Sequence, residues 1–200
     1  MFDPREFRAA LGTFVTGVTI VTARDGSGRP VGLTANSFNS VSLDPPMVLW
    51  SLSLRSASLP VFRDADSWAV HVLAADQQAL SDRFARPGED RFAGLGDSDG
   101  EEGAPMIPGY AARFGCRARF EYEGGDHAIF LGEVVAFERR EVEPLIYHSG
   151  RYGRVMPVAD STPTAEDLAR EGLAETGPEG PVLTTRGQRL FTALETLAKR

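Results

Sequence analysis

Alternating hydrophobic and polar positions between residues 31 and 50 form the clearest structural signal in the chain. The stretch begins as a β-branched strand, passes through a run of hydroxyl and amide side chains, turns at residues 44–46 and resumes at residues 47–50. This pattern predicts two strands joined by a tight, proline-stiffened corner. Its small polar side chains either face water or let a ligand approach the backbone closely.

The flanking segments predict further strands with short helices between them. Val, Thr and Ile enrichment or period-two alternation predicts strands at residues 13–23, 67–73, 111–122, 127–139 and 145–148. Helical apolar spacing predicts helices at residues 3–11, 60–66 and 75–84, the first of them packing on the body. Six or seven short strands favour a mainly β fold with flanking helices, an antiparallel barrel, because closure of a sheet leaves few bare edges.

Two regions lack this pattern. Residues 85–108 are rich in Gly, Asp, Glu and Pro, which predicts a solvated surface loop anchored by Phe92 and Leu95. The composition changes again beyond Met156. We therefore expect residues 1–158 to form the main domain and residues 159–200 to form a linker with a short helical C-terminal extension.

The extension begins with a linker-like run at residues 161–164, and helices are expected at residues 165–174 and 184–199, the second capped by Thr184 or Thr185. The apolar face of the second helix consists of Leu190, Leu194 and Leu197. This tail is either an arm that packs on a partner subunit or a fragment of a small helical module. Residues 183–190 are similar to the wing-to-helix junction of winged-helix regulators, but about 40 residues without a recognition helix are too few for a complete DNA-binding module.

Net charge and cysteine content narrow the functional classes. The 200 residues carry a formal net charge of -7, which argues against a general nucleic-acid binder because affinity for phosphate backbones needs clustered Lys and Arg. The one cysteine, Cys116, has no partner for an internal disulfide, and no apolar run reaches the length of a membrane span. Together with an N-terminus that lacks a signal-like pattern, these features predict a cytoplasmic protein.

The segment that follows the proline corner has the composition of an anion site. Ser56 or Ser58 is placed to cap a helix whose first turn contains Pro60, and Arg55 stands beside it. Unpaired N–H groups and the positive end of the peptide dipole attract anions at a helix start. The same residues also suit an ordinary capped helix with a solvated arginine, so this segment alone leaves both interpretations open.

Three motifs follow one another in a fixed order. They are LTANSFNSVSLDPPMV at residues 33–48, Gly-Asp-His at residues 125–127 before an apolar strand, and Tyr-x-x-Gly-x-Tyr at residues 147–152. In this order they resemble the flavin reductase-like family of FMN-binding split barrels, the reductase components of two-component flavin-dependent monooxygenases. The resemblance covers roughly residues 7–154. It implies an antiparallel Greek-key-type barrel, a homodimer, and a separate monooxygenase that receives the reduced flavin.

The resemblance also implies ligands and the residues that hold them. The ligands are FMN or FAD and, as hydride donor, NADH or NADPH. The flavin would be bound by Thr34, Ala35, Asn36, Ser37, Ser51, Ser53, Arg55, Ser56, Ser58, Arg83 and Phe84. The nicotinamide side would consist of His127, Tyr147, Gly150, Arg151 and Tyr152. Asn36 stands where many relatives have serine, a difference that bears on which flavin fits.

Hydride transfer from a nicotinamide to a flavin needs no protein nucleophile, because the two cofactors carry the bond making and breaking. We therefore expect no essential catalytic residue, and His127 to position the second substrate. We interpret Asp126 as a turn-forming residue, His71 and His148 as structural histidines, and Cys116 as a small buried hydrophobe. No Cys/His spacing indicates a metal site. The alternative function is a non-catalytic flavin- or haem-binding carrier or sensor whose C-terminal extension engages a partner.

Overall fold

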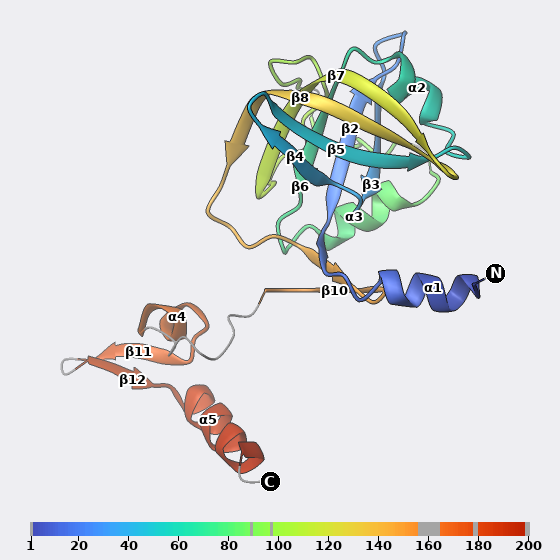
Figure 1. Cartoon of the computed structure of the whole chain (residues 1–200). Coiled ribbons are helices and arrows are strands. Elements are labelled where there is room, and N and C mark those ends of the chain that lie inside the picture. Colours follow the sequence, from blue (N-terminus) through green and yellow to red (C-terminus); the bar gives the residue numbers. More distant parts are fainter. Residues whose placement is uncertain (1, 89, 97, 156–164, 178–179, 199–200) are drawn as a thin grey trace. The chain divides into compact units, whose positions relative to one another are not determined.

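A computed structural model of the chain describes residues 2–88, 90–96, 98–155, 165–177 and 180–198 (Figure 1). Internal contacts divide the chain into two units, Met1–Val155 and Met156–Arg200. The helices are α1 (Pro4–Leu11), α2 (Leu59–Asp64), α3 (Gln78–Ala85), α4 (Ala165–Arg170) and α5 (Thr185–Ala198). The strands of the first unit are β1 (Thr16–Gly17), β2 (Thr19–Arg24), β3 (Pro30–Ala35), β4 (Asn39–Leu43), β5 (Pro46–Ser53), β6 (Ser67–Val72), β7 (Ala112–Gly124), β8 (His127–Arg139), β9 (Ile146–His148) and β10 (Arg151–Gly153). The strands of the second unit are β11 (Ala174–Gly177) and β12 (Gly180–Leu183).

Seven strands of the first unit form one antiparallel sheet in the order β3-β2-β6-β7-β8-β5-β4. β3 and β4 follow each other in sequence yet lie at opposite edges, and the sheet curls until β3 contacts β5 (Figure 1). The predicted antiparallel barrel is confirmed. The predicted pair of strands over residues 31–50 is instead three strands, because the chain leaves the sheet at residues 36–38 to cross from one edge to the other.

Aromatic side chains fill the inside of the barrel. The ring of Trp50 on β5 stacks on Phe130 of β8 with centroids 4.9 Å apart and meets Trp68 of β6 edge-on at 5.9 Å. Helix α2 closes one end by placing Phe62 4.8 Å from the ring of Trp50. All four side chains are buried. Because such aromatic packing is dense and directional, it holds β5 and β8 in fixed positions relative to each other.

A second apolar cluster joins α3 to the opposite face of β2 and β3. Phe84 of α3 lies directly over Gly32, where an added Cβ would come within 2.8 Å of the phenyl ring. Phe92 packs edge-on against Phe84 with centroids 5.0 Å apart, and Leu95 joins the same cluster. These two anchors of the loop after α3 are as predicted. The loop is less solvated than predicted, because Ile107 is also fully buried beneath it.

The N-terminal helix α1 forms as predicted. Asp3 caps it by accepting a hydrogen bond from the backbone N–H of Arg5 at 2.8 Å. None of its residues is buried, and Phe7 and Leu11 are 54% and 60% exposed. The prediction that this helix packs on the body is therefore wrong for the single chain, since its apolar side chains remain open within the part of the chain that the structure describes.

The second unit consists of two helices with a hairpin between them. α4 ends earlier than predicted, before Gly172, which has a φ of +65°. The β11–β12 hairpin was not predicted from the sequence pattern. Thr184 caps α5 by accepting from the N–H of Gly187 at 3.2 Å, which confirms one of the two predicted caps. The expected linker at residues 161–164 and the side chains of Leu194 and Leu197 lie outside what the structure describes.

Across the described residues, no helix combines the length and apolar character that crossing a bilayer would require.

His71 on β6 is fully buried as a neutral imidazole. Its Nε2 accepts a hydrogen bond from the N–H of Ile107 at 3.2 Å, and its Nδ1 lies 3.3 Å from the carbonyl oxygen of Ile20. Burial, reinforced by the charge of Arg113, lowers the pKa of His71 to about 3. Cys116 is buried as well, and burial raises the pKa of its thiol. The structural roles predicted for His71 and Cys116 are confirmed.

We predict that His71 makes the fold sensitive to acid. Its pKa is about 3 in the folded chain and about 6.5 in the unfolded chain, so between these values only the unfolded chain binds the proton. The free energy of unfolding should therefore fall as the pH drops below about 6.5, with His71 contributing a loss of about 2 kcal/mol between pH 7 and pH 5. Urea titrations of the wild type and His71→Gln, which keeps an acceptor for Ile107, measure this contribution. The same pH dependence in both proteins would contradict it.

Candidate functional site

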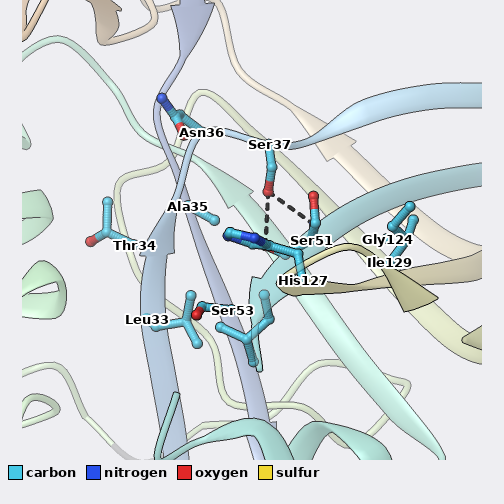
Figure 2. A pocket seen from close by; sticks show the side chains of 11 residues that line it. Leu33, Thr34, Ala35, Asn36, Ser37, Ser51, Ser53, Gly124, His127 and Ile129 are labelled. Atoms are coloured by element: carbon cyan, nitrogen blue, oxygen red, sulfur yellow. Dashed lines mark hydrogen bonds between the residues drawn. The ribbon is translucent and has the colours of Figure 1, made fainter. Parts of the chain in front are cut away.

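The two ends of the curled sheet meet along an opening that we call the seam, where residues 33–37 face residues 51–53. In the described part of the sheet β3 pairs only with β2. The seam is bridged by Ser37, whose hydroxyl donates to the carbonyl oxygen of Ser51 at 3.0 Å and accepts from its N–H at 2.9 Å. Figure 2 shows these two bonds. The side chain of Ser37 thus makes the hydrogen bonds that a neighbouring backbone strand would otherwise make.

A pocket of about 490 Å³ lies along the seam (Figure 2). It is lined by Leu33, Thr34, Ala35, Asn36, Ser37, Ser51, Leu52, Ser53, Gly124, His127 and Ile129. Its volume is within the range of small-molecule sites, which extends from about 300 to about 1,000 Å³. The hydroxyl-rich stretch and the Gly-Asp-His bend, which are distant in sequence, therefore line one pocket. That these residues hold ligands stays a prediction.

Several hydroxyls of the pocket are committed to the scaffold. Thr34 donates to the carbonyl oxygen of Ser81 on α3 at 2.7 Å, and Ser37 bridges the seam. By contrast, the side chains of Asn36 and Ser51 make no hydrogen bond to any other described residue. The amide of Asn36 and the hydroxyl of Ser51 are therefore free to bond with a ligand, whereas the hydroxyls of Thr34 and Ser37 are engaged with the scaffold.

The turn between β5 and α2 lies at one end of the seam. Ser58 occupies the N-cap position, as predicted, but its side chain makes no capping hydrogen bond. Ser53 Oγ accepts from the N–H of Arg55, and Ser56 Oγ accepts from the N–H of Ser58, each at 3.3 Å. The guanidinium of Arg55 is exposed and forms no ion pair within the described chain. This turn keeps a cation available for an anionic group, as the anion-site interpretation requires.

His127 enters the pocket from the β7–β8 hairpin. The turn contains Gly125 with a φ of +68°, and the N–H of Leu54 donates to the carbonyl oxygen of Asp126 at 2.9 Å, which ties the hairpin to the end of β5. His127 also pairs with Ser53 across the β5–β8 ladder. Figure 2 shows its ring pointing from β8 toward β3. The Nδ1 atom lies 2.7 Å from Asp126 Oδ1, and this contact lowers the pKa of the Asp126 carboxyl.

The remaining predicted residues do not line the pocket. They are Arg83, Phe84, Tyr147, Gly150, Arg151 and Tyr152, which lie on α3 or on the β9–β10 hairpin. Phe84 is buried in the second apolar cluster. Tyr147 and Tyr152 meet edge-on with centroids 5.3 Å apart, and Tyr152 donates its hydroxyl hydrogen to Asp82 at 3.0 Å. Their assignment to the ligands stays a prediction.

Four residues of the pocket were not among the predicted ligand-binding residues: Leu33, Leu52, Gly124 and Ile129. Ile129 follows His127 by two positions, so both side chains emerge from the same face of β8. The sequence already shows that Ile129 and His127 are two positions apart. It does not show that their face of β8 lines the seam, which only the register with β5 reveals.

A second pocket, of about 660 Å³, has a different chemistry. Asp66, Glu101, Glu102 and Arg117 are among the residues that line it. The carboxyl of Glu102 is buried in an ion pair with Arg113, so Asp66 and Glu101 stand against Arg117 alone. An excess of negative charge disfavours a phosphate-bearing ligand. No group of three or more His, Cys, Asp or Glu residues within the described ranges is arranged to hold a metal ion. The seam pocket is therefore the better candidate for an anionic cofactor.

Comparison with known proteins gives a consistent family. The sequence profile described as flavin reductase like domain matches residues 11–156. An NADH-dependent FMN reductase of Agrobacterium fabrum is 50% identical over 152 residues, which cover 76% of this chain and 86% of that protein. The reductase component of a flavin-dependent trigonelline monooxygenase from Acinetobacter baylyi is 40% identical over 179 residues, which cover 90% of this chain and 57% of that protein.

Solved structures agree with the sequence relatives. An NADH:FAD oxidoreductase of Streptomyces globisporus, in complex with NAD and FAD fragments, has a TM-score of 0.74 at 40% identity and covers 80% of this chain and 99% of that chain. A putative oxidoreductase from Sinorhizobium meliloti has a TM-score of 0.75 at 43% identity, over 86% of this chain and 59% of that chain. The chain thus spans little more than half of the Acinetobacter and Sinorhizobium proteins. The likeness confirms the predicted split-barrel fold.

We predict that Ser37→Ala weakens both the fold and the pocket. Removing the hydroxyl leaves the N–H and carbonyl of Ser51 unpaired, at a cost of about 1 to 3 kcal/mol in the free energy of unfolding. Loosened seam walls should also lower the affinity for FMN, measured by fluorescence titration. Ser40→Ala on the exposed β4 is the matched control, with an expected change within about 0.5 kcal/mol. A Ser37→Ala protein with wild-type stability and FMN affinity would show that the bridge is unimportant.

Proposed function

This chain belongs to the flavin reductase-like family, and we propose that it transfers a hydride from NADH to FMN or FAD. Relatives named as NADH-dependent FMN and FAD reductases support the activity and favour NADH over NADPH as donor. The observation that carries the proposal is that the hydroxyl-rich wall of the seam and the imidazole of His127 line the same pocket. Such a pocket offers one ligand a polar wall and leaves a second ligand an approach past the histidine.

The chemistry of the pocket fits a flavin. Leu33 and Ile129 offer apolar surface to the ring system, while the amide of Asn36 and the hydroxyl of Ser51 are free to hydrogen-bond with its polar edge. Arg55 at the end of the seam would neutralise the phosphate. When bound, the flavin supplies the ring that accepts the hydride.

The contribution of the protein is alignment. The reacting atoms have to be held about 3 to 3.5 Å apart, and such positioning can lower the barrier by several kcal/mol. Ser37 sets the distance between the two walls of the seam, and His127 fixes where the second ligand lies. Transfer of a hydride moves no proton to or from a side chain, so this arrangement requires no general acid or base among the lining residues.

We also propose where the reduced flavin goes and which residues carry the reductase activity. The relative from Acinetobacter is named as the reductase component of a monooxygenase, which supports transfer of the reduced flavin to a separate monooxygenase. We assign the reductase activity to residues 1–158, since the family match ends at residue 156, and treat residues 159–200 as an extension. The unpaired, buried Cys116 and the use of NADH support a cytoplasmic reaction.

A homodimer is supported by an apolar patch on the outer face of the barrel. The register places Leu49, Leu131 and Phe120 in one row across β5, β8 and β7, and Ile129 and Tyr122 in the adjacent row. Phe120 and Tyr122 are each 54% exposed. Contiguous apolar surface of this kind is characteristic of protein interfaces. Because Ile129 belongs to both the patch and the pocket, a second subunit on this face would lie beside the ligand.

We predict that His127→Ala impairs the use of NADH more than the binding of FMN. Loss of a positioning contact should raise KM for NADH about tenfold or more, with a smaller change in the dissociation constant of FMN. NADH oxidation with added FMN under argon measures the first quantity, and flavin fluorescence the second. His148→Ala, which alters an exposed histidine outside the pocket, should behave like the wild type. A flavin-loaded wild-type protein that does not oxidise NADH would refute the proposed reductase activity and favour the alternative of a non-catalytic carrier.

We predict that Phe120→Asp converts a dimer into a monomer. A carboxylate within the apolar patch would have to be desolvated in the interface, which costs more than the interface gains there. Sedimentation velocity at micromolar concentration measures the assembly state. Val142→Asp places the same charge at an exposed valine after β8. It is the control, and this variant should remain dimeric. A monomeric wild-type protein would rule the homodimer out.

A further inference from the structure

The carboxylate of Asp126 is exposed to solvent yet held in a defined contact. Its side chain is 88% exposed, and Oδ1 lies 2.7 Å from Nδ1 of His127. The backbone of the same residue is fixed by the hydrogen bond from Leu54 to its carbonyl oxygen. An exposed pair of this kind adds little to the stability of a fold. The contact instead engages Nδ1 of the His127 imidazole in a hydrogen bond.

The chemistry of the two groups decides which nitrogen carries the proton. An ionised carboxylate only accepts hydrogen bonds, so the contact requires a hydrogen on Nδ1 of His127. In the neutral imidazole this leaves Nε2 with a lone pair, and in the protonated ring Nδ1 still donates to Asp126. Nε2 is therefore the ring nitrogen that remains for a ligand in the pocket. When the ring is neutral, it presents a hydrogen-bond acceptor there.

We propose that Asp126 is a positioning residue that keeps the neutral His127 protonated at Nδ1, so that Nε2 accepts a hydrogen bond from the second substrate. The proposal rests on the proposed function and narrows it, because it calls for a dinucleotide whose reacting ring carries an N–H donor. The primary carboxamide of nicotinamide is such a group. The site would then discriminate by this donor, since a polar group left unpaired in the complex lowers affinity.

Two substitutions separate this role from the plain requirement for a turn residue. Glycine suits a tight hairpin turn but offers no acceptor, whereas asparagine suits the turn and keeps a carbonyl oxygen at the position of Oδ1. If Asp126 only shapes the turn, Asp126→Gly and Asp126→Asn should behave alike. If it orients His127, only Asp126→Asn should preserve the wild-type behaviour. Asp64→Ala, at an exposed carboxylate at the end of α2, is the control.

The first test reads the tautomer directly and needs no turnover. Long-range ¹H–¹⁵N NMR spectra of the ligand-free protein, recorded where the His127 ring is neutral, distinguish a protonated from an unprotonated ring nitrogen. The chain has three histidines, and His127→Gln assigns the signal. We expect the proton on Nδ1 in the wild type and in Asp126→Asn, and a shift toward the Nε2–H form in Asp126→Gly. A wild-type ring protonated at Nε2 would overturn the proposal.

The second test measures kcat/KM with saturating FMN for NADH and for reduced 3-acetylpyridine adenine dinucleotide, in which an acetyl group replaces the carboxamide and no N–H donor remains. Loss of one hydrogen bond predicts a fall of about tenfold for NADH in Asp126→Gly and a change within about twofold for the analogue. FMN affinity should be unchanged. Equal losses for both dinucleotides would overturn the proposal. A wild type without NADH turnover would refute the proposed function instead, and the spectra would still decide the tautomer.

Discussion

Hydrogen bonds between backbone strands do not close the barrel, because its two edge strands, β3 and β4, do not pair with each other. β3 and β4 are neighbours in sequence but lie at opposite edges of the seven-stranded sheet, so the chain crosses the opening at residues 36–38. There the hydroxyl of Ser37 contacts both backbone groups of Ser51. One side chain thereby satisfies polar groups that a paired strand would otherwise satisfy, and it leaves the rest of the seam open. The function we propose depends on this incomplete sheet.

The register of the sheet then determines what faces the seam. The ladder between β5 and β8 sets His127 opposite Ser53, and Leu54 hydrogen-bonds to the hairpin turn at Asp126. Because these bonds join the turn to β5, the imidazole and the hydroxyl-rich wall keep one geometry. The rigid aromatic core behind β5 and β8, centred on Trp50, supports the same positions. Alignment of two ligands needs this kind of fixed framework.

Much of the fold was predictable because its signals are local. Alternation and turn residues located most strands, and ordered motifs located the walls of the pocket around Ser37 and His127. Features that depend on register were not predictable. Ser37 was predicted to bind the flavin, which stays a prediction, but the bridge that its hydroxyl makes between the strands could not be read from the sequence. Ile129 faces the pocket only through the pairing of β5 with β8. The N-terminal helix was predicted to pack on the body, yet its Phe7 stays exposed because amphipathicity does not say what covers a helix.

A crystal structure of the protein soaked with FMN tests the central claim most directly. The account predicts difference density for the isoalloxazine ring in the seam pocket, in contact with Asn36, Ser51 or His127, with the Ser37 bridge intact. Density in the second pocket, which Asp66 and Glu101 line, with the seam empty, would contradict it.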